Sequence, residues 1–298
     1  MKRFFPLLLV AVILITGCGK EQESSSVPTE LIVTDVTSRE EQPHSDYPME
    51  VCGVEIKEEL RRAVSLSPAV TEIMSELGLT DRLCGISSYC DYPDELEKQT
   101  AGSSENPDMA IITALEPDGV FTLSGLSERD IYALEDINAA VVCLKAPVTM
   151  EEYSALYRDI AAPFIGTEKA QKAADEAVSA LKAAAEGAFS GSYVYITPKL
   201  TAAGADTFEN AVLSLAGENI CTAAGYNDIL TLAESMPKYI IAADSLSYSD
   251  IAGDDTLAGY IDGGAEIIYV PAERFERPTA RTAEIFSTIR EHFTAESE

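Results

Sequence analysis

The sequence predicts an α/β protein with two lobes, each built on a parallel sheet, joined by one long interdomain helix. Three observations support this fold class. Short apolar runs rich in β-branched residues alternate with segments of helical periodicity, which is typical of buried parallel strands between helices. The two halves of the chain repeat a similar order of strands, prolines and glycines. Between them, residues 167–188 are rich in Ala, Glu and Lys and contain no proline, which predicts the long helix.

The expected elements follow from apolar runs and from capping residues. Strands are expected at 63–66, 83–86, 119–123, 140–144, 193–197, 239–243 and 266–270. The first helix has Ser67 as its N-cap, Pro68 at its first position and Gly78 at its end. Asp254-Asp255 is expected to begin a helix rather than to form an acid/base pair. Further helices are expected at 106–116, 127–137, 207–216 and 279–293.

The two halves share one junction in particular. Each half runs from a strand into a hydroxyl-bearing residue followed by proline, Ser67-Pro68 in the first and Thr197-Pro198 in the second, and then into a helix that a glycine closes. Two similar lobes predict a cleft between them. Junctions of this kind also occur in unrelated α/β proteins, which is the alternative interpretation.

The first residues have the features of a bacterial export signal. Lys2 and Arg3 precede an apolar run that is shorter than the roughly 20 residues that a membrane-spanning helix needs. The run ends in a lipobox, ITGC, whose last residue is Cys18 and whose thiol would accept diacylglycerol. We therefore expect residues 1–17 to be a signal peptide and Cys18 to carry the lipid anchor. A plain cleaved signal with an incidental cysteine is the alternative.

The rest of the chain divides by composition and pattern. Residues 18–47 are rich in Glu, Ser, Gln and Pro and are expected to form a disordered acidic tether. The N-terminal lobe is expected to cover 48–165, the linking helix 166–188 and the C-terminal lobe 189–298. No other stretch is long and apolar enough to cross a membrane, so we expect the lobes to lie on the extracytoplasmic face of the cell membrane.

The composition excludes several classes of function. A net charge of −29 leaves no basic face for nucleic acid. The only histidines are His44 and His292, so neither a Ser-His-Asp or Cys-His catalytic site nor a histidine-rich metal site is expected. The glycines do not form a phosphate-binding loop. We therefore predict no enzymatic activity, no catalytic residue, no resident metal and no cofactor.

Cysteine usage gives no disulfide framework. Apart from Cys18, five cysteines remain, an odd number without CxxC spacing. Cys84 and Cys143 lie in apolar runs and are expected to be buried small hydrophobic residues rather than ligands.

Polar and aromatic residues gather after the predicted strands, where open α/β sheets bind their ligands. The densest group is SSYCDYP at 87–93, whose two tyrosines offer stacking area and hydrogen bonds. A second group, ERFERP at 273–278, follows the last strand. Each group could instead have a purely structural role. Residues 87–93 could form a turn whose tyrosines cover the core, and residues 273–278 could form a solvated loop with local ion pairs.

At these residues the chain resembles the helical-backbone substrate-binding proteins of ABC importers, which take up cobalamin, ferric siderophores or haem. The resemblance extends from Arg62 to the end of the chain. Its motifs are AVSLSP at 63–68, SSYCDYP at 87–93, ALEPD at 114–118, LAGENI at 215–220 and RPTAR at 277–281. It implies two Rossmann-like lobes joined by one long helix, and a monomer that captures a ligand and delivers it to a permease and its ATPase.

Residues 87–93 and 275–281 are most similar to the vitamin B12-binding members of this family. The resemblance therefore implies a corrinoid as ligand. It also implies a ligand site that comprises Ser67, Tyr89, Asp91, Ser104, Leu123, Glu273, Phe275 and Arg277. In the B12-binding members the positions of Ser104 and Leu123 hold tryptophan, which this chain lacks, so the expected pocket is less aromatic.

Other ligands and functions remain as alternatives. An anionic ferric siderophore could be bound by Arg277, Arg274 and Lys199. Haem would need an axial ligand, for which Tyr89 is available. The chain could also be a ligand-sensing lipoprotein without a transport role. An enzyme on the same scaffold, with Cys90 or Tyr89 acting on the ligand, would lack a base to assist it.

Members of the family dock on the permease through one acidic residue on each lobe. The matching positions here are Ala110 and Leu230, and Asp108 and Asp228 precede them by two residues. Because the displacement is the same in both lobes, we expect Asp108 and Asp228 to make the docking contacts.

Replacing Cys18 with Ala should release the protein from the membrane, because the thiol that accepts the lipid is lost. Fractionation of cells by ultracentrifugation measures this. Cys52→Ala, which leaves the lipobox intact, should stay with the membrane and serves as the control. Membrane association of the Cys18→Ala protein at the level of the control would contradict the lipid anchor.

Overall fold

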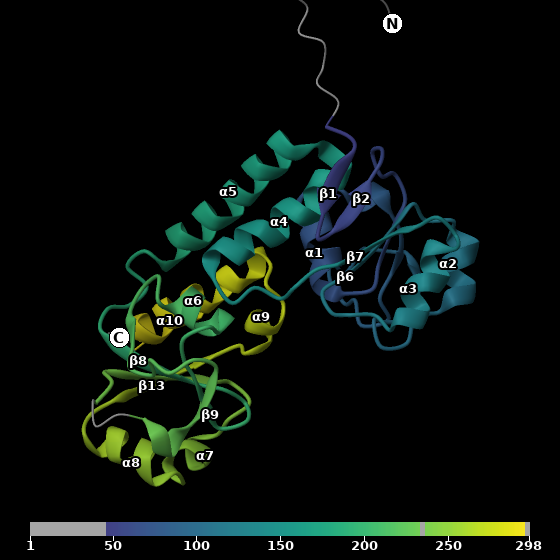
Figure 1. The fold of residues 1–298 in the computed structure, drawn as a ribbon. Coiled ribbons are helices and arrows are strands. Elements are labelled where there is room, and N and C mark those ends of the chain that lie inside the picture. The colour runs from purple at the N-terminus through teal and green to yellow at the C-terminus, as the bar shows by residue number, and fades with distance from the viewer. Residues whose placement is uncertain (1–45, 233–235, 296–298) are drawn as a thin grey trace, which may run out of the picture. The chain divides into compact units, whose positions relative to one another are not determined.

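A computed structural model describes residues 46–232 and 236–295 of the chain, and these residues belong to one compact unit. Cys18, the 1–17 segment and nearly all of the expected tether at 18–47 lie outside the described residues. Figure 1 shows the arrangement of helices and strands.

The first half of the chain forms a five-stranded parallel sheet. Its strands are Ala63–Ser65 (β3), Leu83–Ile86 (β4), Gln99–Thr100 (β5), Gly119–Thr122 (β6) and Ala140–Cys143 (β7). They are arranged in the order β5-β4-β3-β6-β7. The strands β3 and β6 are buried along their whole length, which is why they read as apolar runs. The connecting helices are Pro68–Glu76 (α1), Thr80–Arg82 (η1), Met109–Leu115 (α2) and Glu128–Glu135 (α3). An antiparallel hairpin of Met49–Val51 (β1) and Val54–Ile56 (β2) precedes the sheet.

The second half forms a six-stranded mixed sheet. Its strands are Ser192–Ile196 (β8), Thr201–Ala203 (β9), Glu218–Asn219 (β10), Tyr226–Asp228 (β11), Tyr239–Ala243 (β12) and Glu266–Val270 (β13). The order is β11-β9-β8-β12-β13, with β10 paired to β8. The β8, β12 and β13 strands are parallel, and β9 and β11 are antiparallel to their neighbours. The helices are Phe208–Leu213 (α6), Ile229–Thr231 (η2), Tyr248–Ala252 (α7), Asp255–Asp262 (α8), Glu273–Glu276 (α9), Ala280–Ala283 (η3) and Glu284–Ala295 (α10).

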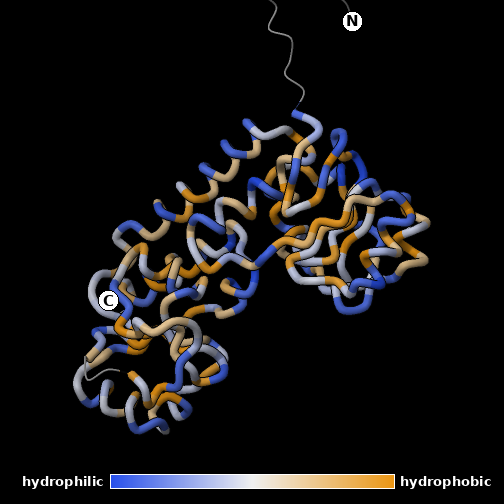
Figure 2. Tube along the Cα trace, in the orientation of Figure 1, coloured by the Kyte–Doolittle hydropathy of each residue, from blue (hydrophilic) through white to orange (hydrophobic). Residues whose placement is uncertain are grey.

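Two helices connect the sheets. Met150–Ile165 (α4) and Thr167–Ala185 (α5) pack side by side along much of their length (Figure 1). Gly166 separates them with φ +81, a left-handed conformation that suits glycine. Hydrophobic and hydrophilic residues alternate along α5 in Figure 2, as expected of a helix with one buried face. The expected long helix is therefore present as α5, and α4 is a second helix that the sequence analysis did not assign.

The fold class is confirmed, and each of the seven expected strands is present with ends within one residue of the expected ones. The expected helix start at Asp254-Asp255 is also confirmed, because Asp254 accepts the backbone N–H groups of Thr256 and Leu257 at 3.0 Å each. The second sheet differs from expectation in being mixed rather than purely parallel.

The repeat between the two halves breaks at Thr197-Pro198. Ser67 is followed directly by α1, whereas Thr197-Pro198 leads into a tight turn and then β9. The turn is closed by a hydrogen bond from the Leu200 N–H to the Thr197 carbonyl at 3.0 Å, with Leu200 at φ +54. An extra antiparallel strand therefore separates the Thr-Pro junction from the next helix, α6.

Aromatic residues of α4 contact both halves of the molecule. The Phe164 ring lies 5.5 Å from Phe121 of β6, and the Tyr153 ring stacks 5.7 Å from Phe208 of α6. These residues belong to one continuous hydrophobic core. Buried aromatic pairs add roughly 0.5–1.5 kcal/mol beyond the area they bury. Helix α4 is therefore a central packing element rather than a simple linker.

Two glutamates of α1 are held by the segment that follows β13. Glu72, with 1% of its side chain exposed, accepts a hydrogen bond from Arg277 Nη1 at 2.9 Å and from the Thr279 hydroxyl at 3.2 Å. Glu76 accepts the Ala280 N–H at 3.0 Å and the Tyr157 hydroxyl at 2.5 Å. The contacts from Arg277, Thr279 and Ala280 join segments that are about two hundred residues apart in the sequence.

Desolvation of its carboxyl group raises the pKa of Glu76 to about 7, although the hydrogen bonds from Tyr157 and Ala280 act in the opposite direction. The ordinary value is 4.5. Because the folded-state pKa is the higher one, protonated Glu76 stabilises the fold, and its contribution is complete below about pH 4.5 and is lost as the pH rises to about 7.

Glu76→Gln should flatten the fall in the free energy of unfolding between pH 4.5 and 7, because Gln has a similar shape and stays neutral across this range. Urea unfolding across this range measures the effect as the difference between variant and wild type. Glu135→Gln, at an exposed position of α3, is the control for a general loss of charge. A difference that does not vary with pH would show that Glu76 does not titrate as described.

Candidate ligand-binding site

Four residues of the expected site follow the carboxyl ends of parallel strands in the first sheet. Ser67 follows β3, Tyr89 follows β4, Ser104 follows β5 and Leu123 follows β6. Because these strands are parallel, the four residues share one edge of the sheet, where open α/β sheets bind ligands. Tyr89 is 66% exposed, whereas Ser67 is buried and the other two are half-buried. Tyr89 is thus the side chain of this group that is free to contact a ligand face.

Asp91 and Arg277, both expected site residues, form an ion pair with each other. Arg277 Nη1 donates to Asp91, and Nη2 donates to the second carboxylate oxygen of Asp91 at 3.2 Å. The hydrogen bonds from Arg277 hold the pKa of Asp91 below its usual range. Since Arg277 also binds the buried Glu72, two carboxylates neutralise its single charge. Nearby, the guanidinium of Arg281 lies 4.2 Å from the centre of the Tyr92 ring.

The other cations near this edge differ in their partners. Arg274 pairs with Glu273 at 2.7 Å and with Glu284 at 2.6 Å, so the expected site residue Glu273 is engaged in a local ion pair. Lys199, in the turn after β8, is exposed and makes no ion pair with any described residue.

A cavity of about 270 Å³ lies where the segments that follow β7, β8 and β13 meet. We call it the aromatic–acidic cavity. It is lined by Ala146, Pro147, Val148, Tyr195, Pro198, Phe208, Glu209, Tyr226, Ala272, Phe275, Glu276 and Pro278. It therefore includes the expected site residue Phe275 and joins the carboxyl edges of the two sheets.

The aromatic–acidic cavity combines ring faces with carboxylates. Tyr195 and Phe275 pack edge to face with their ring centres 5.0 Å apart. The Tyr226 hydroxyl donates to both carboxylate oxygens of Glu209, at 3.0 and 3.2 Å. Burial raises the pKa of Glu209, and burial together with Glu209 raises the pKa of Tyr226 to about 12. Such a surface can stack on a flat apolar ligand and accept hydrogen bonds from its polar edge.

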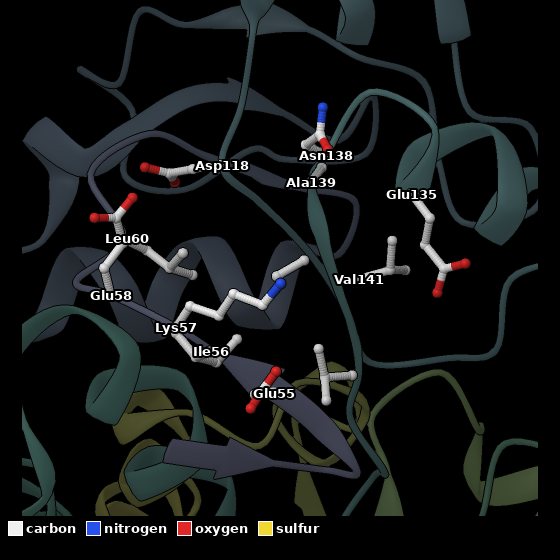
Figure 3. Close-up of a pocket in the computed structure, with 12 residues that line it drawn as sticks. Glu55, Ile56, Lys57, Glu58, Leu60, Asp118, Glu135, Asn138, Ala139 and Val141 are labelled. Carbon is white, nitrogen blue, oxygen red and sulfur yellow. The ribbon is translucent and has the colours of Figure 1, made fainter. Parts of the chain in front are cut away.

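A larger cavity, of about 570 Å³, lies at the opposite edge of the first sheet (Figure 3). Asp118 and Ala140 in its wall stand at the amino ends of β6 and β7. Asp118 is occupied in holding the backbone N–H groups of Arg61 and Arg62, at 2.7 and 2.9 Å. Because ligands of open α/β sheets bind at carboxyl ends, we assign the candidate site to the aromatic–acidic cavity and the loop around Tyr89 instead.

Sequence reasoning missed several cavity residues. Tyr195 lies in an apolar strand and reads as a core residue, and Glu209 reads as an ordinary acid in the first turn of α6. Tyr226 offered a weak signal, because it is a tyrosine in a polar stretch directly after Gly225.

The two expected docking acids cap helices at the surface. Asp108, the N-cap of α2, accepts the Ile111 N–H at 3.1 Å, and Asp228, the N-cap of η2, accepts the Leu230 N–H at 3.0 Å. Both acids are exposed, and Leu230 is 75% exposed. Neither acid forms an ion pair with a residue in the described part of the chain, so both keep a charge that another protein can contact.

Within residues 46–232 and 236–295, no helix has both the length and the apolar character required to cross a bilayer.

Known proteins resemble this chain in sequence. It is 28% identical to an uncharacterized ABC transporter substrate-binding lipoprotein of Bacillus subtilis over an alignment of 178 residues. This alignment covers 59% of this chain and 54% of that protein. It is 36% identical to the vitamin B12-binding protein of Salmonella typhimurium over an alignment of 115 residues, and this alignment covers 38% of this chain and 42% of that protein. The chain thus spans about half the length of the curated relatives it matches.

Solved structures resemble the fold. The periplasmic haem-binding protein of Vibrio cholerae matches 80% of this chain and 99% of its own length, with a TM-score of 0.64 and 16% identity. The periplasmic vitamin B12-binding protein of the same organism matches 80% and 98%, with a TM-score of 0.56 and 20% identity. A family model described as periplasmic binding protein matches residues 64–259, which is more than half of the chain. The chain therefore belongs to the periplasmic binding protein family.

Proposed function

We propose that the chain is a substrate-binding lipoprotein of an ABC importer that captures a corrinoid and delivers it to a permease on the extracytoplasmic side of the membrane. The observation that supports this most directly is the aromatic–acidic cavity at the carboxyl edges of both sheets, with the exposed Tyr89 on the neighbouring edge. Relatives named as vitamin B12-binding proteins support the choice of corrinoid.

The remaining parts of the proposal concern attachment and mode of action. Cys18 would tether the lobes through its lipid, as the lipobox predicts and as the name of the Bacillus subtilis relative suggests. The protein would act as a monomer and bind its ligand without changing it, in keeping with a family of binding proteins. Haem is the second candidate ligand, because the exposed Tyr89 hydroxyl offers an axial oxygen ligand for iron.

The test is to titrate the purified, unlipidated protein with cobalamin, cobinamide, ferric siderophores and haem, and to follow binding by calorimetry and absorbance. Saturable binding of the corrinoids alone, with the ligand recovered unchanged, is the expected result. Binding of haem or a siderophore alone would replace the corrinoid with that ligand. Binding of none would favour a ligand-sensing or other role outside these three ligand classes.

Tyr89→Ala should weaken corrinoid binding by more than about 1 kcal/mol, or roughly fivefold, because the exposed ring would lose its stacking contact. Tyr132→Ala is the matched control, since Tyr132 of α3 is 65% exposed but follows no strand end. Calorimetric titration of both variants gives the comparison. Equal affinities for the two variants would remove Tyr89 from the site.

Charge reversal at the proposed docking acids should abolish transport and leave ligand affinity unchanged. Asp108→Lys combined with Asp228→Lys would place lysines against the arginines that we propose the permease presents. Uptake of labelled ligand by cells measures the effect, and calorimetry verifies binding. Asp262→Lys, at an exposed position at the end of α8, is the control for added positive charge. Wild-type uptake by the double variant would exclude these two acids from docking.

A further inference from the structure

The hydroxyl of Tyr195 has no hydrogen-bond partner among the described residues. Tyr195 is 1% exposed, lies in β8 and lines the aromatic–acidic cavity. The hydroxyl is not among the fully buried side-chain atoms that lack a partner, so it borders open space at the cavity. Buried polar groups in proteins nearly always have partners. A hydroxyl that lacks a partner at the wall of a cavity is therefore positioned to bond a group that enters the cavity.

The cavity is acidic, and no basic side chain compensates it. Glu209 and Glu276 both line it, and among the described residues neither has an ion-pair partner. None of the lining residues is Lys, Arg or His. Burial, and then the charges of Glu209 and Asp244 among others, raise the pKa of Tyr195, so its hydroxyl stays protonated and able to donate. The groups that face the cavity thus comprise carboxylate acceptors and one free phenol.

The apolar part of the wall strengthens the electrostatic effect of the acidic residues on a ligand. The rings of Phe208 and Phe275 are more than nine-tenths buried and line the cavity with three prolines and Val148. Charges in such low-dielectric surroundings interact more strongly than in water. An entering carboxylate would meet two like charges there, whereas an amide N–H or a cation would find acceptors and aromatic faces.

We propose that the aromatic–acidic cavity selects ligands whose edge carries amide or cationic groups and rejects ligands whose edge carries carboxylates. With a volume of about 270 Å³, the cavity receives one edge of a ligand rather than the whole molecule. This inference rests on the proposed function and sharpens it. It favours the neutral amide fringe of a corrinoid over haem, with its two propionates, and over an anionic tris-catecholate chelate.

A direct test uses small probes, so that it does not depend on the identity of the imported ligand. The wild-type protein, with its tyrosines labelled with ¹³C, is titrated with propionamide, tetramethylammonium and propionate, and Tyr195→Phe identifies the Tyr195 signal. Propionamide and tetramethylammonium should shift that signal, and propionate at the same concentration should not. A shift by propionate of equal size, or no shift by any of the three probes, would overturn the inference.

A second test uses matched full-size ligands. Cyanocobalamin is compared with its monocarboxylic acids, in which one peripheral amide is hydrolysed to a carboxylate. The acid whose carboxylate enters the cavity should bind at least about tenfold more weakly, and Glu209→Gln with Glu276→Gln should remove most of that difference. Glu218→Gln, an exposed acid of β10, is the control for charge, and thermal unfolding verifies the fold.

The outcomes separate the two proposals. Equal binding of cyanocobalamin and all its acids would overturn the inference and leave corrinoid capture standing. The expected response to the small probes without binding of any corrinoid would support the inference and remove the corrinoid. A difference between amide and acid that survives in the double Gln variant would show that the two glutamates do not cause it, which also overturns the inference.

Discussion

The burial of one carboxylate, that of Glu72, fixes the geometry of the candidate site. Glu72 lies on α1 and its side chain is buried. Its carboxylate accepts hydrogen bonds from Arg277 and Thr279, which belong to the segment after β13. Breaking such a pair by removing one partner typically costs about 3–5 kcal/mol, because the remaining charge stays buried. The segment after β13 must therefore stay against α1. Phe275 and Pro278, on either side of Arg277, line the aromatic–acidic cavity, so an ion pair outside the cavity positions its wall.

The same pairing decides which charges a ligand meets. Arg277 is shared between Glu72 and Asp91, and Arg274 is held by its neighbouring glutamates, so an anionic chelate would have to compete with carboxylates already in place. Lys199 is exposed and without an ion pair among the described residues, but it does not line the cavity. These three basic residues suggest an anion site when only the sequence is considered. They contribute little positive potential at the cavity itself, because Glu209 and Glu276 are the ionisable acids in its wall.

Local patterns predicted much of the fold, and distant contacts account for what they missed. The seven predicted strands were predictable because they are largely buried and so read as apolar runs, whereas β5, β10 and β11 are short and at least partly exposed and give no such run. Helix α4 was not predicted from the sequence, because Pro163 lies in its last turn and its aromatic residues mask a simple helical periodicity. The carboxyl-edge rule pointed to the segments 87–93 and 273–278, which contain Tyr89 and Phe275. No local rule could predict that Arg277 binds Glu72, since 205 residues separate them.

Helix α4 also explains why the cavity can exist before a ligand arrives. Its Tyr153 stacks on Phe208, a wall residue, and its Glu152 accepts the backbone N–H of Val148, another wall residue, at 2.8 Å. The wall is therefore attached to a helix whose other aromatic residues are packed in the core. A site held in this way loses little conformational entropy on binding, so more of the contact energy remains as affinity. Rigidity also sharpens selection, because Glu209 and Glu276 cannot easily move away from an entering carboxylate when the rings around them are fixed.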